Sequence, residues 1–198
     1  MIRQVANLSV LQIAMYTALL ALVGVAGNHF NLPLFFSVSL IFGSIAAFIA
    51  LITLGLIPAL IVGAIAGSYT WILWGHPYAV AIFVAEILFV GLLRNKIKVY
   101  AYSDFLFWIV LGIPLVILFY SKTMGLPDST VFLIALKQTI NGVLNAIIAP
   151  LIVSLSTLMR KSELGNSARI SAKQLVASAL MLMTILAGGV PIIFNNYR

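Results

Sequence analysis

The chain has 198 residues, of which 63% are hydrophobic and only 8% are charged. Soluble domains carry about 25% charged residues, so this composition excludes a soluble catalytic domain and predicts a polytopic membrane protein. Cysteine is absent, which excludes disulfides and cysteine metal sites, and the net charge of +7 lies in short loops rather than in a nucleic-acid-binding patch.

Hydrophobic runs long enough to cross a bilayer divide the chain into seven predicted transmembrane segments. In chain order they cover Ser9–Gly27, Leu34–Leu54, Pro58–Trp74, Tyr78–Leu93, Phe105–Tyr120, Val131–Leu158 and Leu175–Phe194. Residues 34–74 are too long for one crossing, and the only turn signal inside them is Gly55–Pro58. We therefore place the boundary between the second and third segments at this turn.

The distribution of basic residues predicts the orientation of these segments, because cytoplasmic loops of membrane proteins are rich in Lys and Arg. Seven crossings with a cytoplasmic N-terminus place eight of the eleven basic residues inside: Arg3, Arg94, Lys96, Lys98, Arg160, Lys161, Arg169 and Lys173. Lys122 and Arg198 then lie outside, and the C-terminus of the chain is extracellular or periplasmic.

The sixth segment carries a polar stripe. Lys137, Asn141 and Asn145 recur at every fourth position and therefore share one face of a helix. A lysine in hydrocarbon costs about 3 kcal/mol on the mildest scale, so such residues are paired, hydrated or functional. Glu86 in the fourth segment lies at a similar depth, about 10 Å below the outer surface at a helical rise of about 1.5 Å per residue. We therefore expect Glu86 and Lys137 to form an ion pair, which either locks two helices together or borders a ligand cavity.

The stripe and nearby aromatic residues predict a polar cavity that opens to the outside of the membrane. The predicted ligand-binding residues are Glu86, Lys137, Gln138, Asn141, Asn145, Trp71, Trp74 and Tyr78. Lys137 and the asparagines would form the floor, Glu86 the side, and the aromatic residues the rim. The alternative interpretations are interhelical hydrogen bonds for the asparagines and an interfacial belt for the aromatic residues. Opposite charges in the cavity favour an amphoteric or polar ring-bearing ligand.

Motifs for nucleophilic catalysis, zinc binding and phosphate binding are absent from the sequence. We identify no catalytic residue, no metal-ligand set and no cofactor site, so this segment is not expected to be an enzyme. His29 and His76 have no acidic residue near them in the sequence, and Asp104 is interpreted as a charge at the N-terminus of the fifth segment.

The stretch Leu54–Gly67, in which small residues follow a Gly-Pro turn, resembles a pattern shared by two families of membrane proteins. One family is the substrate-binding S-components of energy-coupling-factor vitamin transporters. The other is the multi-helix membrane sensor module of LytS-type and related bacterial receptors. In both, a late helix with asparagines, here Asn141–Pro150, faces a pocket. The resemblance covers about Ser9–Leu158 and implies an all-α transmembrane bundle with a six-helix S-component-like core, to which this chain adds a seventh helix.

The seventh segment favours the receptor family, because an S-component does not need it. The expected parts are a sensor core (1–158), a basic cytoplasmic loop (159–173) and a seventh helix (174–198) that leads to an absent extracellular domain. By analogy, the chain is the ligand-sensing module of a histidine kinase or cyclic-dinucleotide enzyme in a bacterial inner membrane. Its expected partners are lipid, a small molecule and, through the full-length receptor, a second copy. The alternative is an S-component-like subunit of a vitamin or small-molecule transporter.

Overall fold

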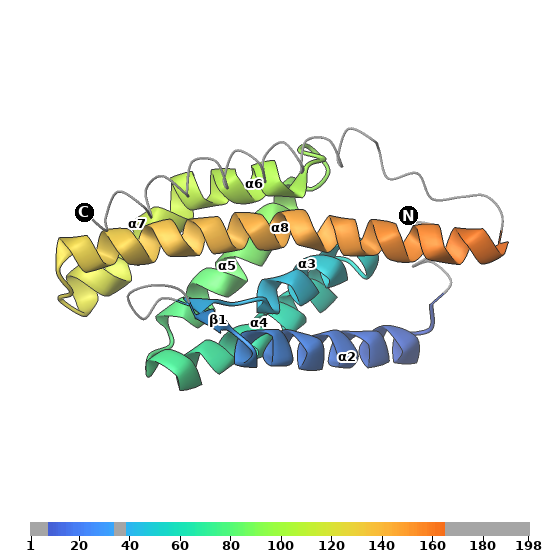
Figure 1. The fold of residues 1–198 in the computed structure, drawn as a ribbon, viewed down its shortest axis with the longest axis horizontal. Coiled ribbons are helices and arrows are strands. Elements are labelled where there is room, and N and C mark those ends of the chain that lie inside the picture. The colour runs from blue at the N-terminus through green and yellow to red at the C-terminus, as the bar shows by residue number, and fades with distance from the viewer. Residues whose placement is uncertain (1–7, 34–38, 165–198) are drawn as a thin grey trace.

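The computed structural model describes residues 8–33 and 39–164, whose helices form an all-α bundle (Figure 1). Four of these helices are long and apolar enough to cross a membrane, namely Val10–His29, Leu56–Trp74, Tyr100–Thr123 and Asp128–Ser156. Two shorter apolar helices cover Gly43–Thr53 and Tyr78–Leu93. The seventh expected segment lies outside the described residues, as does most of the expected basic loop.

The described elements follow the expected order, with additions around the second segment. They are α2 (Val10–His29), β1 (Leu32–Pro33), β2 (Ser39–Leu40), α3 (Gly43–Thr53), α4 (Leu56–Trp74), α5 (Tyr78–Leu93), α6 (Tyr100–Phe107), η1 (Trp108–Gly112), α7 (Ile113–Val116), η2 (Ile117–Thr123) and α8 (Asp128–Leu164). The elements from α6 to η2 follow without a break, so they form one helix with two π-helical stretches. Pro114, which has no N–H to donate, lies between those wider turns.

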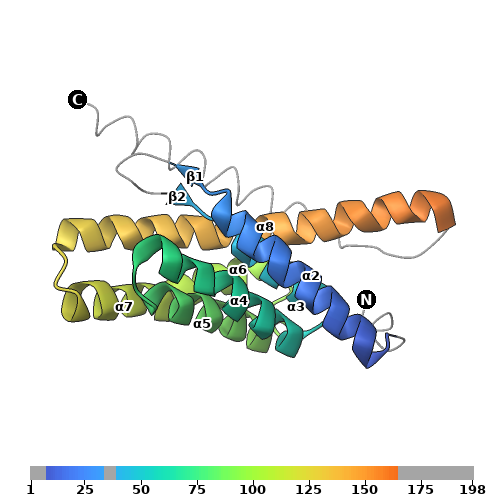
Figure 2. The ribbon, with the colours of Figure 1, turned by 90° about the horizontal axis from the view of Figure 1, so that it is seen from below.

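Five helices surround the centre of the bundle. α4 packs against α3 and α5, α5 packs against α6, and α8 packs against both α6 and α3, which closes the circle. α2 lies outside this circle, against α3 and α4 (Figures 1 and 2). One hydrophobic core surrounds Phe48 and Val62, and a second surrounds Phe107 and Ile147. The circle encloses the polar residues discussed below.

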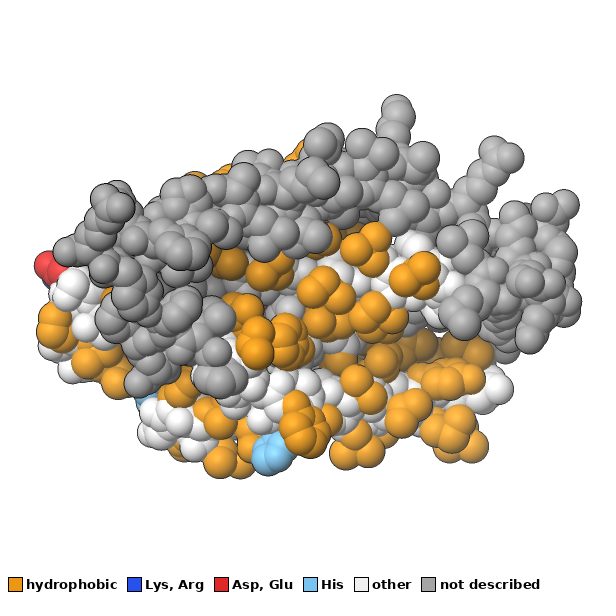
Figure 3. Space-filling model, in the orientation of Figure 1, with side chains coloured by type: hydrophobic (Ala, Val, Ile, Leu, Met, Phe, Trp, Pro, Cys, Tyr) orange, Lys and Arg blue, Asp and Glu red, His pale blue; other side chains and the backbone are white. Residues whose placement is uncertain are grey.

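The surface of the bundle is apolar, as a lipid environment requires. Large hydrophobic side chains are exposed on α2, including Leu19, which is 56% exposed, and Leu22, which is 68% exposed. Figure 3 shows hydrophobic side chains spread across the visible part of this face, with an acidic side chain only at one end. Apolar exposure of this extent marks a membrane or protein contact surface.

Small residues let the helices of this bundle approach closely. A Cβ at Gly24 of α2 would lie 2.7 Å from Ala66 Cβ of α4, so this crossing requires a glycine. On the opposite side of α4, Gly63 packs on Ile87 and Gly67 packs on Phe83 of α5. Gly63, Ala66 and Gly67 of the stretch Leu54–Gly67 are therefore buried against α2 and α5, whereas Ala64 is exposed.

Two glycines end helices at the turns that the sequence indicates. Gly55 separates α3 from α4 with a φ of 105°, and Gly75 ends α4 with a φ of 74°. Side chains with a Cβ rarely adopt this left-handed region, which explains glycine at both positions. The predicted boundary between the second and third segments is confirmed.

The expectation that residues 34–54 form one helix is wrong, because the helix begins only at Gly43. α3 has 11 residues, about 16 Å of rise against the roughly 30 Å of a hydrocarbon core. The chain reaches α3 through β1 and β2, which pair antiparallel with Leu32 opposite Leu40. The backbone that precedes α3 therefore needs hydrogen-bond partners from elsewhere in the bundle.

α8 is the longest element of the described chain. Its 37 residues rise about 55 Å, which exceeds the roughly 30 Å of a hydrocarbon core. Figure 2 shows its C-terminal part extending beyond the other helices. The helix carries Lys137 and the asparagines in its first half and continues past Pro150 to Leu164.

Candidate functional site

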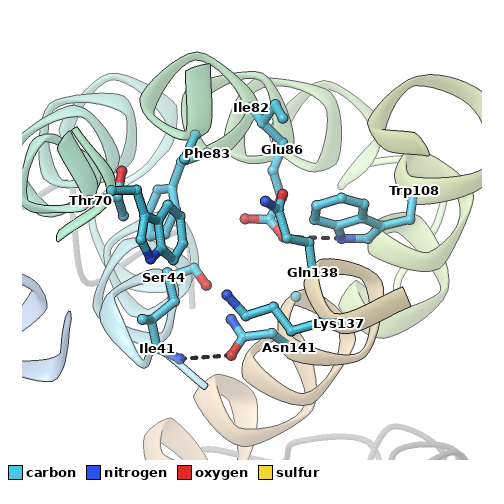
Figure 4. A pocket seen from close by; sticks show the side chains of 13 residues that line it. Ile41, Ser44, Thr70, Ile82, Phe83, Glu86, Trp108, Lys137, Gln138 and Asn141 are labelled. Carbon is cyan, nitrogen blue, oxygen red and sulfur yellow. Dashed lines mark hydrogen bonds between the residues drawn. The ribbon is translucent and has the colours of Figure 1, made fainter. Parts of the chain in front are cut away.

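An inner pocket of about 30 Å³ lies inside the circle of helices, large enough for one water-sized group (Figure 4). Its lining comes from the start of α3 and from α4, α5, η1 and α8. The lining residues are Ile41, Ser44, Thr70, Trp74, Ala79, Ile82, Phe83, Glu86, Trp108, Lys137, Gln138, Asn141 and Gly142. Four of the predicted polar site residues, Glu86, Lys137, Gln138 and Asn141, are brought together here.

The expected ion pair between Glu86 and Lys137 is not formed, although both residues line this pocket. Trp108 Nε1 donates a hydrogen bond of 3.3 Å to Glu86 Oε1, and Lys137 Nζ lies 4.4 Å from the centre of the Trp74 ring. Glu86 Oε1 lies against Gly142, five residues after Lys137 on α8. That spacing corresponds to a rise of about 7.5 Å along α8, so Glu86 meets this helix at a different level from the backbone of Lys137.

Asn145 and Asn141 hold the backbone that leads into α3. Asn145 Nδ2 donates to Ile41 O at 2.9 Å and to Ser44 Oγ at 2.7 Å, and Asn141 Oδ1 accepts from Ile41 N at 2.9 Å. Asn145 is 1% exposed and is absent from the lining of the pocket. Its role in the described structure is therefore to satisfy buried main-chain groups, which is the alternative interpretation of the stripe.

Asn141 combines this role with a place in the pocket. Both Asn141 and Lys137 line the pocket, and Figure 4 shows the Asn141 oxygen facing the main chain at Ile41. Asn28 on α2 assists at the same junction, because its Oδ1 accepts from Gly43 N at 2.7 Å and its Nδ2 donates to Ala66 O at 2.8 Å. Sequence analysis missed Asn28, whose only signal is an amide at the end of an apolar helix.

A second, larger cavity of about 450 Å³ adjoins the inner pocket. Trp74, Lys137 and Gln138 line both spaces. The outer cavity is lined by Ser39, Trp74, His76, Tyr120, Met124, Leu126, Thr130, Leu133, Ile134, Lys137 and Gln138. Its volume lies within the range of about 300–1,000 Å³ that is typical of small-molecule sites, and its lining is mostly apolar with a few polar groups.

The predicted aromatic rim is only partly assembled. Trp74 lines both spaces, whereas Trp71 is 56% exposed and lines neither. Tyr78 stacks on Phe119 at 4.9 Å and on His76 at 5.3 Å, so it supports the residues around the outer cavity without lining it. Trp71 thus has the exposure expected of an interfacial belt residue.

His76 lines the outer cavity, although it is not among the predicted ligand-binding residues. It lies in the turn between α4 and α5, and its ring packs edge-on against Tyr120 at 5.1 Å. Burial lowers the pKa of His76, because desolvation disfavours the charged imidazolium. His76 is therefore neutral at physiological pH and presents a polar aromatic edge to the cavity.

Asp104 and Trp108 were missed as site residues. The helix that was expected to start at Phe105 starts at Tyr100, so Asp104 lies inside it and is completely buried. The interpretation of Asp104 as an N-terminal helix charge is wrong. Asp104 and Trp108 are four residues apart, so they share a helical face that points at Glu86. The four-residue spacing of Asp104 and Trp108 was the signal in the sequence that could have identified them as site residues.

Comparison with known proteins does not assign the chain to a family: no family profile, no curated protein and no solved structure matches it. Among the described residues, no group of three or more His, Cys, Asp or Glu side chains could hold a metal ion. The described arrangement thus contains two neighbouring spaces that share Trp74, Lys137 and Gln138, and the inner one is also lined by Glu86 and Asn141.

Proposed function

We propose that this chain is a membrane-embedded module that binds a small polar, ring-bearing molecule in the outer cavity. The observation that carries the proposal is the junction at Lys137, Gln138 and Trp74, where a cavity of ligand size meets a buried polar pocket. Lys137 is half-buried, and its ammonium contacts the face of Trp74. It is therefore a cation available to a ligand at modest cost, since cation–π contacts are worth about 1–2 kcal/mol.

The lining indicates the chemistry of the ligand. Lys137 and Gln138 supply donors at the inner end, which suit a carboxylate, carbonyl or heterocyclic nitrogen. Trp74, His76 and Tyr120 supply aromatic walls for a ring, and Leu133 with neighbouring apolar residues faces its body. A simple fatty acid could place its carboxylate at Lys137, but it has no ring for the aromatic walls.

α8 connects this site with the rest of the protein. The same helix lines the pocket and the outer cavity, holds the entry to α3 through Asn141 and Asn145, and continues to Leu164. A ligand that shifts Lys137 would therefore act on one rigid element that leads toward the C-terminal part of the chain. This supports a sensing role, in which the ligand biases a two-state element, over a transport role.

The wider setting of the proposal follows the resemblance. We infer a bacterial inner-membrane protein with a cytoplasmic N-terminus, which acts as the sensor module of a dimeric histidine kinase or cyclic-dinucleotide receptor. An S-component-like transport subunit remains the alternative. Uptake of the bound compound into vesicles that contain the chain together with a transporter ATPase would favour that alternative.

The experiment is a thermal-shift screen of the purified chain against polar ring-bearing compounds. Lys137→Met is compared with Lys122→Met, because Lys122 is exposed in η2 and lines neither space. We expect a compound that raises the unfolding temperature of the wild type and Lys122→Met but not of Lys137→Met. Stabilising compounds that act equally on all three proteins would refute binding at Lys137, and a screen without hits would refute the ligand class.

A further inference from the structure

Two acidic side chains lie next to each other inside the helix bundle. Glu86 on α5 is 2% exposed and Asp104 on α6 is 0% exposed. Asp104 Oδ2 lies 3.0 Å from the position that a Cβ on Gly142 would occupy, and Glu86 Oε1 lies against that same position. The two carboxyl groups therefore converge on one point of α8, where the glycine leaves room for them.

Asp104 has no hydrogen-bond partner in the described structure. Both of its carboxyl oxygens are buried and unpaired, and so is the hydroxyl of its neighbour Ser103. Glu86 receives one hydrogen bond, from Trp108 Nε1. Buried carboxylate oxygens are almost always paired in native proteins, so the carboxyl group of Asp104 requires a hydrogen-bond partner.

No basic group neutralises the pair among the described residues. On α8, Lys137 is the ionisable residue of the pocket, and its ammonium is directed at Trp74. On α6, Tyr100 lies one turn before Asp104. The pocket residues of α3 and α4, which are Ser44, Thr70 and Trp74, carry no ionisable side chain. Two negative charges would therefore face each other in a low-dielectric environment, which strongly disfavours ionisation of both.

We propose that Glu86 and Asp104 share one proton and form a proton-binding site inside the bundle. In the protonated pair, Asp104 donates an O–H hydrogen bond to Glu86, so that one carboxyl group is neutral and the pair carries a single negative charge. Trp108 stabilises the remaining carboxylate by its N–H. Glu86 lines the inner pocket, which is the route by which the proton exchanges with the outside.

A proton fits this site better than a metal ion. Divalent cations such as Ca²⁺ and Mg²⁺ require about six or more oxygen ligands, and the described residues supply two carboxyl groups without a third acidic or histidine side chain. The Trp108 N–H points at Glu86 and would repel a cation bound there. A shared proton removes the repulsion between the carboxyl groups and provides Asp104 with a hydrogen-bond partner.

This inference goes beyond ligand binding and does not depend on it. Loss of the proton would leave two carboxylates side by side between α5 and α6, where they would push those helices apart. The pair thus provides a pH-sensitive link between two helices of the circle around the pocket, whatever occupies the outer cavity.

Infrared spectroscopy of the full chain in vesicles of ether-linked lipids, which have no ester carbonyl, tests the proposal, because the chain has only four Asp and Glu residues. We expect a carbonyl-stretch band of a protonated carboxyl group at pH 7. The band should remain in Asp128→Asn, which alters an exposed acid at the start of α8, and should be lost in the double variant Glu86→Gln/Asp104→Asn. A wild-type spectrum without this band, or a band that survives in a folded double variant, would overturn the proposal.

A second measurement on the wild type needs no substitution. Carboxyl-¹³C labelling of aspartate, and separately of glutamate, should shift the band with at least one of the labels. Asp104 and Asp128 are the only aspartates, so a shift with labelled aspartate that persists in Asp128→Asn assigns the proton to Asp104. A band that neither label shifts does not come from an Asp or Glu side chain and would refute the shared proton.

Discussion

Replacement of Asn145 by leucine tests whether this residue serves the fold, as its contacts indicate. The substitution keeps approximate side-chain volume but removes the amide that donates to Ile41 O and Ser44 Oγ. Both acceptors lie at the start of α3, inside the bundle, where water cannot replace the lost donor. The carbonyl of Ile41 would then be left buried and unpaired.

The expected loss of stability follows from these two contacts. A buried polar group left without a partner costs about 1–3 kcal/mol, whereas hydrogen bonds between membrane helices average only about 0.6 kcal/mol, because side chains find alternative partners. The main-chain carbonyl of Ile41 cannot rotate toward another donor in the described structure. We therefore expect Asn145→Leu to lower the free energy of unfolding by about 2 kcal/mol, the sum of two unpaired groups at the low end of that range.

The assay is reversible unfolding in mixed detergent micelles, followed by far-ultraviolet circular dichroism. Thr139→Val is the matched control, because the Thr139 hydroxyl donates at 2.8 Å only to Ala135 O, one turn back on the same helix. That local bond contributes little to a helix, so the control should remain close to the wild type. If Asn145→Leu is no less stable than Thr139→Val, Asn145 does not hold the entry to α3 and the reasoning fails.

Three further predictions concern packing, pH dependence and topology. Gly142→Ala places a Cβ against Glu86 Oε1 and should lower the free energy of unfolding by about 1–3 kcal/mol in the same micelle assay. A Gly142→Ala variant that is as stable as the wild type would show that α8 does not approach the two acids this closely. Burial lowers the pKa of His76 from its ordinary value of 6.5, so the unfolded chain binds more protons below that pH and stability should fall as the pH drops. As the pH drops, the unfolding temperature of His76→Gln should fall less steeply than that of the wild type. The same slope in both proteins would exclude this linkage. Cysteine introduced at Ser121 should react with an impermeant thiol reagent in intact cells and cysteine at Ser162 should not, and the opposite labelling would reverse the proposed orientation.

The amino-acid sequence alone located most of the helices, although not all of their ends. Apolar run length predicted most of the helices, and the turn signal at Gly55 set the boundary between α3 and α4. These features depend on interactions within a few residues, so they can be recognised from the sequence. The polar stripe on α8 was also predictable, because helical periodicity alone places Lys137 and Asn141 on one face.

The tertiary structure decided the partners of the polar residues. Periodicity shows which residues share a helical face, but it does not show how far one helix is displaced or rotated against the next. In the folded bundle, Glu86 meets Asp104 and Trp108 beside Gly142, whereas the Lys137 ammonium lies over Trp74. The short length of α3 could not be predicted from the sequence either. The non-helical backbone before α3 is hydrogen-bonded by a side chain more than one hundred positions away, in the bond from Asn145 to Ile41 O. Main-chain acceptors have no residue-type signature, so only the folded arrangement reveals which asparagines serve them.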